Sequence, residues 1–298
     1  AQRCSEARER SPERLHLDRC SLQRCPALLG EDRLRLLNLQ ANEITYISNL
    51  DSTPNLVFLD LYDNKVQKIE GLGHLPNLRV LMLGKNQIGA IENLDMLPKL
   101  DVLDLHSNQL EAIGNLHSLS RLRVLNLAGN SLTSLHNLES LANLTELNVR
   151  KNAIASLEGL AGLSGLLRVF ASHNRLATWA SLECLQELSS LKELALEANP
   201  ICHHPEFLLR LLSTSSSIEV IDGQTVTEGM RESARCVQSS SNLIDNTASA
   251  VVDAAPSNLA TMLHAVQAAL SGGPEVQRPS SASKRPMSAR SNNNNNNN

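Results

Sequence analysis

Hydrophobic residues recur along the chain in one fixed frame, with Leu, Ile or Val at seven set positions around a single Asn. The stretch 100–119 shows this frame most clearly, with Leu100, Leu103, Leu105, Asn108, Leu110, Ile113, Leu116 and Leu119. The two leucines that stand one residue apart before the Asn follow the period of a strand, in which alternate side chains point inward. The apolar positions after the Asn leave room for a turn or a 3-10 segment rather than a full helix. Each repeat is therefore predicted to hold one short strand and one short return segment.

The Asn of this frame recurs every 22 residues, apart from one final interval of 25. The ladder consists of Asn42, Asn64, Asn86, Asn108, Asn130, Asn152, Asn174 and Asn199. A period of 20–29 residues with this frame is the signature of leucine-rich-repeat solenoids. We therefore predict an α/β solenoid, a horseshoe with parallel strands on its concave side, short turns or 3-10 segments on its convex side and a C-terminal helical cap. The repeated amides are predicted to be structural, because each can satisfy backbone groups that are buried where the chain turns inward.

The domain boundaries follow from where this frame begins and ends. We expect a lead-in at 1–11, nine repeats at 12–212, a C-terminal cap at 200–235 and a tail at 236–298. The first repeat is degenerate, since Cys20 stands where the ladder would place an Asn. The three extra residues before Asn199 predict a longer helix over 181–190. In the cap, Pro205 is placed in the first turn of a helix, and in the Ser-rich tail a helix is expected only at 257–270.

Composition and charge narrow the class of partner and the compartment. The 27 basic and 31 acidic side chains give a net charge of −4, so no general attraction to nucleic acid or a membrane is expected. No apolar run approaches the roughly 18 residues of a membrane span. The six cysteines contain no Cys-x-x-Cys pair, and the charged start resembles no signal peptide. These features favour a reducing, cytoplasmic location, and the absence of an initial methionine fits a piece of a longer protein.

The chain contains no motif that is typical of catalysis. It has no Gly-x-Ser-x-Gly, no phosphate-binding Gly-rich loop and no His-Glu-x-x-His. The run Cys202-His203-His204 lacks a second pair of ligands nearby, so no metal site is predicted there. We therefore expect a non-catalytic protein without a cofactor, a metal or a small-molecule substrate.

The concave side offers the best candidate for a protein-binding surface. Residues two, four and six positions before each ladder Asn should face it together. The predicted site consists of Phe58, Asp60, Tyr62, Met82, Asp104, His106, Arg150, Arg168 and Phe170. Aromatic and apolar groups are typical of interface hot spots; the aspartates could pair with a basic partner segment, and the two arginines with an acidic one. The alternative is that these are ordinary solvated strand residues.

Several stretches that go beyond the general frame carry a resemblance to known proteins. They are residues 12–20, 34–40, 59–64, 83–86 and 103–108. The period and cap resemble the Sds22-like intracellular leucine-rich-repeat family. Over about residues 11–180, the chain further resembles the leucine-rich-repeat subunits of tubulin polyglutamylase complexes.

This resemblance implies a particular kind of function. It implies a non-catalytic subunit that holds together or targets a complex on cilia, basal bodies, centrioles or other parts of the microtubule cytoskeleton. Its partners would be tubulin-modifying subunits or tubulin. Two alternatives within the same family are a protein phosphatase-1 regulatory subunit and an RNA-processing scaffold of the U2 A-prime type.

Overall fold

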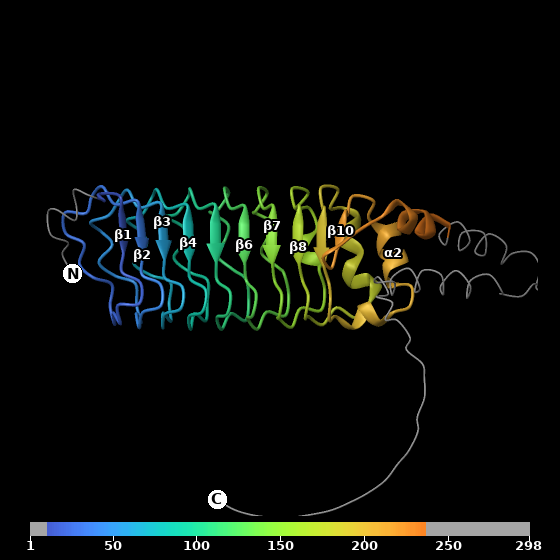
Figure 1. The fold of residues 1–298 in the computed structure, drawn as a ribbon, viewed down its shortest axis with the longest axis horizontal. Coiled ribbons are helices and arrows are strands. Elements are labelled where there is room, and N and C mark those ends of the chain that lie inside the picture. Colours follow the sequence, from blue (N-terminus) through green and yellow to red (C-terminus); the bar gives the residue numbers. More distant parts are fainter. Residues whose placement is uncertain (1–10, 237–298) are drawn as a thin grey trace, which may run out of the picture. The chain divides into compact units, whose positions relative to one another are not determined.

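A computed structural model describes residues 11–236 of the chain. The lead-in up to residue 10 and the tail from residue 237, including the helix expected at 257–270, lie outside the described residues. Nine parallel strands of three residues each follow one another in sequence order (Figure 1). They are β1 (Arg14–His16), β2 (Leu36–Asn38), β3 (Phe58–Asp60), β4 (Val80–Met82), β5 (Val102–Asp104), β6 (Val124–Asn126), β7 (Glu146–Asn148), β8 (Arg168–Phe170) and β9 (Glu193–Ala195).

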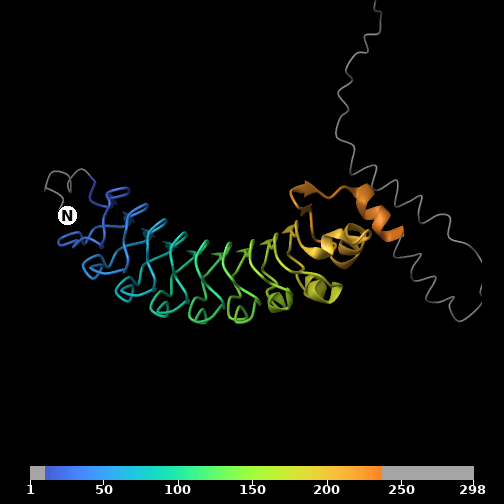
Figure 2. The ribbon, with the colours of Figure 1, turned by 90° about the horizontal axis from the view of Figure 1, so that it is seen from below.

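Each strand buries its middle residue and leaves its two outer residues on the concave side. In β3, Leu59 is fully buried whereas Phe58 and Asp60 are half-buried. Figure 2 shows the stacked turns of the described chain curving, with the strands lining the inner side of the curve. The predicted fold class, a leucine-rich-repeat solenoid with parallel concave strands, is therefore confirmed.

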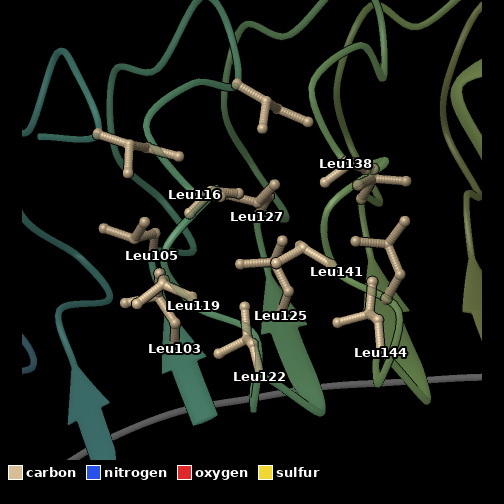
Figure 3. Close-up of a cluster of buried hydrophobic side chains, with 14 of the residues drawn as sticks. Leu103, Leu105, Leu116, Leu119, Leu122, Leu125, Leu127, Leu138, Leu141 and Leu144 are labelled. Carbon is tan, nitrogen blue, oxygen red and sulfur yellow. The ribbon is translucent and has the colours of Figure 1, made fainter. Parts of the chain in front are cut away.

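The core is one continuous column of leucines that passes from repeat to repeat. Leu103 and Leu105 come from the strand side of one turn, and Leu116 and Leu119 from its return segment; all four are fully or almost fully buried. Figure 3 shows them packed beside the equivalent leucines of the next turns, such as Leu125. Because neighbouring turns share this core, each repeat depends on those beside it for stability.

The ladder asparagines tie adjacent turns together through their side-chain amides. Asn86 accepts a hydrogen bond from the Val66 backbone N–H at 2.9 Å and donates to the carbonyls of Leu61 at 2.9 Å and Leu83 at 3.0 Å. The same pattern recurs at the other ladder positions, for example at Asn130. Each amide thus satisfies backbone groups of two adjacent turns, at positions beyond the short strands where the strands no longer pair.

A second asparagine ladder lies on the return segments, and the sequence analysis missed it. Asn49, Asn93, Asn115 and Asn137 have φ between 56° and 68°, and each donates from its amide to a carbonyl 24 residues earlier at 2.7–2.9 Å. Gly71 stands in the same register at φ 68°, where an added Cβ would lie 2.5 Å from the Ile47 carbonyl oxygen. The signal was present as Asn or Gly at a 22-residue period, because both tolerate left-handed backbone.

The convex side consists of turns with two 3-10 helices, η1 (Glu158–Leu160) and η2 (Trp179–Gln186). The helix expected at 181–190 was therefore placed wrongly: it begins and ends earlier and has 3-10 geometry. Within it, the Cys184 thiol lies 3.0 Å from the Leu157 carbonyl oxygen, and burial raises the pKa of this thiol to about 12. The extra length of this repeat thus packs inward on the preceding turn.

The cap consists of η3 (Pro200–His203), α2 (Phe207–Thr214), β10 (Val220–Ile221) and β11 (Gln224–Thr225), followed by helical residues 228–236. Pro205 precedes the N-cap residue Glu206, so its predicted place in the first turn of the helix was wrong. β10 pairs in parallel with β9 and covers its edge. Asp222 accepts hydrogen bonds from the backbone N–H groups of Leu196 at 2.7 Å and Glu197 at 2.9 Å, which ends the solenoid without leaving these donors unpaired.

Candidate protein-binding surface

The predicted surface residues fall into two clusters along the concave side. The strand register aligns Asp60, Met82 and Asp104 on adjacent strands, while Phe58 lies at the start of β3. Tyr62 and His106 follow β3 and β5 by two residues, and these six form the first cluster. The second cluster lies on and just after β7 and β8, and comprises Arg150, Arg168 and Phe170. The strand β6 between them carries no predicted site residue.

Tyr62 and His106 form an aromatic pair at the centre of the first cluster. Their ring centroids lie 5.5 Å apart although the two residues belong to turns that are not adjacent. Gly84 of the intervening turn permits this contact, because an added Cβ would lie 2.5 Å from the His106 ring and 3.2 Å from the Tyr62 ring. Lys85 places its ammonium 5.1 Å from the Tyr62 ring centroid, and its interaction with the Tyr62 side chain raises the pKa of that ammonium. The Tyr62 ring is thus held in position from two sides.

Asp104 is occupied within the molecule and is not available in the way that the sequence analysis expected. Its side chain is only 8% exposed. One carboxylate oxygen lies 2.8 Å from His106 Nδ1 and also accepts the His106 backbone N–H at 3.0 Å. Asp104 therefore orients the His106 ring, and pairing with a basic partner segment would require breaking these bonds. Reversing its charge is expected to destabilise the fold, because it would bury an unpaired cation.

The last residue of several strands has a structural role that the sequence analysis missed. The side-chain oxygens of Asn38, Asp60, Asn126 and Asn148 each accept the backbone N–H of the residue two positions later, at 2.9–3.3 Å. Such local bonds are typical of Asn and Asp at turns. The signal was the recurrence of these two residue types four positions before the ladder Asn. Asp60 therefore helps to end β3 besides facing the concave side.

The environment of Asp60 disfavours its charged form. Burial raises the pKa of this carboxyl above its ordinary value of 3.8, and the charges of Asp104 and Asp18 raise it further, whereas the hydrogen bond from Tyr62 N–H opposes the shift. A carboxyl whose pKa is raised on folding weakens the fold while it is ionised. That penalty is present at neutral pH and disappears as the pH falls below the ordinary value.

Replacing Asp60 by Asn should therefore stabilise the protein at pH 7 by up to about 0.5 kcal/mol. The amide oxygen keeps the hydrogen bond to Tyr62 N–H, and the buried charge is removed. The gain, measured as the difference in melting temperature from the wild type, should shrink as the pH is lowered towards 3.8. Asp63→Asn removes a charge from the exposed neighbouring position and is the control; an equal gain from both variants would contradict the assignment to burial.

In the second cluster, one arginine is paired and the other lies over an aromatic ring. Arg168 donates to the Glu146 carboxylate from Nε at 2.8 Å and from Nη2 at 2.7 Å, so this arginine already has an acidic partner within the molecule, although 51% of its side chain is exposed. The guanidinium of Arg150 lies 4.3 Å from the Phe170 ring centroid. Within residues 11–236, Arg150 forms no ion pair, so its charge is available to a partner.

An apolar row runs beside the first cluster along five consecutive strands. The first residues of β2 to β6 are aligned by the register and are all half-buried: Leu36, Phe58, Val80, Val102 and Val124. With Met82, this row gives the concave side a continuous apolar strip next to a fixed aromatic pair. Apolar and aromatic groups that remain partly exposed in this way are suited to anchor the side chains of a protein partner.

Neither a metal-binding group nor a membrane-spanning helix occurs among the described residues. Among residues 11–236, no group of three or more His, Cys, Asp or Glu is arranged to hold a metal ion. Within the same residues, no helix combines the length and apolar character needed to cross a membrane.

Comparison with known proteins agrees with this architecture. A family model described as "Leucine-rich repeat" matches residues 21–134, and one described as "Leucine Rich repeats (2 copies)" matches residues 120–162. A leucine-rich-repeat protein of Leptospira interrogans has a similar structure, with a TM-score of 0.62 and 28% identity, over 70% of this chain and 54% of that one. The ectodomain of the Arabidopsis thaliana receptor kinase GASSHO1/SCHENGEN3, solved in complex with CASPARIAN STRIP INTEGRITY FACTOR 2, gives a TM-score of 0.52 and 27% identity, over 63% of this chain and 24% of that one.

Curated relatives match this chain over a short segment. Human Leucine-rich repeat-containing protein 49 is 47% identical over 58 residues, which make up 20% of this chain. The match spans only 8% of that relative's length. Together with the repeat frame and the parallel solenoid, these findings make the chain a leucine-rich-repeat protein related to Leucine-rich repeat-containing protein 49.

Proposed function

We propose that this protein is a non-catalytic scaffold that binds a protein partner on its concave side. The observation that carries the proposal is the Tyr62–His106 pair, which Gly84 and Asp104 hold in a fixed arrangement beside the apolar row. A ring that is already positioned loses little conformational freedom on binding, so it contributes more to affinity than a mobile side chain. A structural neighbour, the plant receptor ectodomain, was solved in complex with CASPARIAN STRIP INTEGRITY FACTOR 2, which supports a binding role for such a solenoid.

We further propose that the partner belongs to a microtubule or ciliary complex such as tubulin polyglutamylase. The support is the resemblance of residues 11–180 to the leucine-rich-repeat subunits of these complexes, together with the segment shared with Leucine-rich repeat-containing protein 49. The protein would then hold or target tubulin-modifying subunits in the cytoplasm, at the cytoskeleton, cilium, basal body or centriole.

Replacing Tyr62 by Ala should weaken partner binding at least tenfold, or about 1.4 kcal/mol. The substitution removes the ring that His106 and Lys85 hold in place, but it leaves the buried leucines untouched. The measurement is affinity capture by the tagged chain from extracts of ciliated cells, with captured proteins identified by mass spectrometry. The matched control is Tyr46→Ala, because Tyr46 is the other tyrosine of the chain and is exposed outside the two clusters.

The identity of the captured proteins tests the finer proposal. Tubulin-modifying subunits that are captured by the wild type and by Tyr46→Ala, but not by Tyr62→Ala, would support it. Capture of protein phosphatase-1 or of a U2 partner would favour one of the two alternatives within the family. Capture that survives Tyr62→Ala but is lost on deleting residues 236–298 would place the binding element in the tail and contradict the concave surface.

A further inference from the structure

A basic cleft lies beside the N-terminal ends of strands β2 to β5. Tyr62 and His106 lie beyond the C-terminal ends of β3 and β5, so the cleft is at the opposite end of the strands. It has a volume of about 470 Å³. Four of its lining side chains are cationic, namely Arg33, Arg35, Arg79 and Lys99, whereas only one, Glu13, is acidic. This balance contrasts with the chain as a whole, which carries a net charge of −4.

The wall of the cleft is held by hydrogen bonds between successive turns. Asn55 donates from its amide to the Asp32 carbonyl at 2.9 Å, and Asn77 donates in the same way to the Pro54 carbonyl at 3.1 Å. The Asn77 side-chain oxygen in turn accepts a hydrogen bond from Lys99 Nζ at 2.7 Å. The spacing of the cleft's cationic groups is therefore set by the 22-residue repeat and not by mobile loops.

Within the described part of the chain, most of the positive charge in the cleft has no acidic partner. Arg79 pairs with Asp101, and among the described residues Lys99 bonds only to the neutral Asn77. Arg33 and Arg35 form no ion pair within residues 11–236. At the next strand after β5, Arg123 precedes β6 in the same way and is exposed, so it extends the row of cations beside the strand starts. An unpaired arginine fork is suited to bind a carboxylate through two parallel hydrogen bonds.

We infer that this basic cleft binds an extended acidic segment of a protein partner. Adjacent strands are about 4.8 Å apart, so Arg33 and Lys99, separated by three strand spacings, span roughly 14 Å. In an extended peptide, every second side chain points the same way at intervals of about 6.6 Å. Acidic residues at alternate positions of a segment of about five residues would therefore reach the cations at both ends of the cleft.

The lining favours a peptide over RNA. Single-stranded nucleic acid is usually held by aromatic side chains on which its bases stack, in addition to cations. The cleft has no aromatic side chain, and its apolar member is Val57. This inference rests on the proposed scaffold function and deepens it, because it adds a second contact that selects partners by their negative charge.

The test uses the purified full chain and a fluorescein-labelled peptide of ten glutamates, with binding followed by fluorescence anisotropy. Arg33→Ser combined with Arg35→Ser should raise the Kd at least tenfold, and raising NaCl from 50 to 150 mM should weaken wild-type binding because exposed charges are screened. The matched control, Lys68→Ser with Arg175→Ser, removes two exposed charges elsewhere and should change the Kd less than twofold. Both double variants should keep the wild-type melting temperature.

Three results would overturn the inference. They are equal loss of affinity in the two double variants, binding of a ten-glutamine peptide as tight as that of the glutamate peptide, and tighter binding of a ten-nucleotide uridine RNA. Tyr62→Ala should leave glutamate-peptide binding unchanged, because Tyr62 lies at the other ends of the strands. Failure of the peptide experiment would therefore leave the concave surface standing, whereas failure of partner capture would not affect the peptide result.

Discussion

Leu105→Asp is expected to unfold the central repeats and to lower the free energy of unfolding by more than about 4 kcal/mol. Leu105 is fully buried within the leucine column that joins neighbouring turns (Figure 3). A carboxylate at this position would lie among leucines with no group to pair with it. Because each turn is stabilised by its neighbours, the loss should extend to the adjacent repeats and not stay at one site.

Circular dichroism during heating, together with hydrogen exchange at β4 to β6, would measure this effect. Leu167→Asp is the matched control, since it makes the same chemical change at a leucine that is 40% exposed. The control should stay within about 0.5 kcal/mol of the wild type, as is usual for a surface substitution. Similar melting curves for the two variants would show that the assigned repeat register is wrong.

Asn86→Leu is expected to cost about 3 kcal/mol, although the two side chains are similar in size. The substitution leaves the buried Val66 N–H without an acceptor and removes the amide's donated bonds to the Leu61 and Leu83 carbonyls. An unsatisfied buried donor costs about 1–3 kcal/mol, and each lost hydrogen bond adds about 1 kcal/mol. The two carbonyls keep a partner, because Asn64 and Asn108 also donate to them, so the loss should be limited to one junction between turns.

Asn143→Leu provides the control for this prediction. Asn143 is exposed and donates one hydrogen bond, to the Ser120 carbonyl at 2.7 Å. Water can replace that bond, so the variant should lose less than about 1 kcal/mol. Thermal and urea unfolding of both variants would measure the difference. Equal stability of Asn86→Leu and Asn143→Leu would mean that the ladder amides do not hold the turns together.

The contacts that Asp104 and Arg168 make within the molecule change which residues should be substituted to test binding on the concave surface. Asp104 and Arg168 were both expected to be open to a partner, but His106 occupies the first and Glu146 the second. Substitutions at these positions would alter the arrangement of the protein itself as well as its binding. Tyr62 and Arg150 are better probes, because each projects onto the concave side without forming an ion pair among the described residues.

The repeat frame alone was sufficient to predict the fold class, and the reason is local. A strand of three residues shows its inward and outward positions directly in the sequence, and a fixed period places the same position of every turn in one row. The sequence alone therefore assigns Phe58, Asp60 and Tyr62 to the concave side. The frame also carried the second ladder, as Asn49 and its equivalents every 22 residues.

Only the tertiary structure decided which of these concave groups are free. The contact between Tyr62 and His106 skips a turn and depends on the absence of a side chain at Gly84. The pairing of Arg168 with Glu146 and the shape of the basic cleft beside Arg35 depend on distances across different repeats. The sequence pattern shows in which row of equivalent positions a residue lies, because the rows follow from the 22-residue period. It does not report which neighbour in the row a long side chain will reach, because that follows from side-chain rotamers and from the packing of the turns against one another.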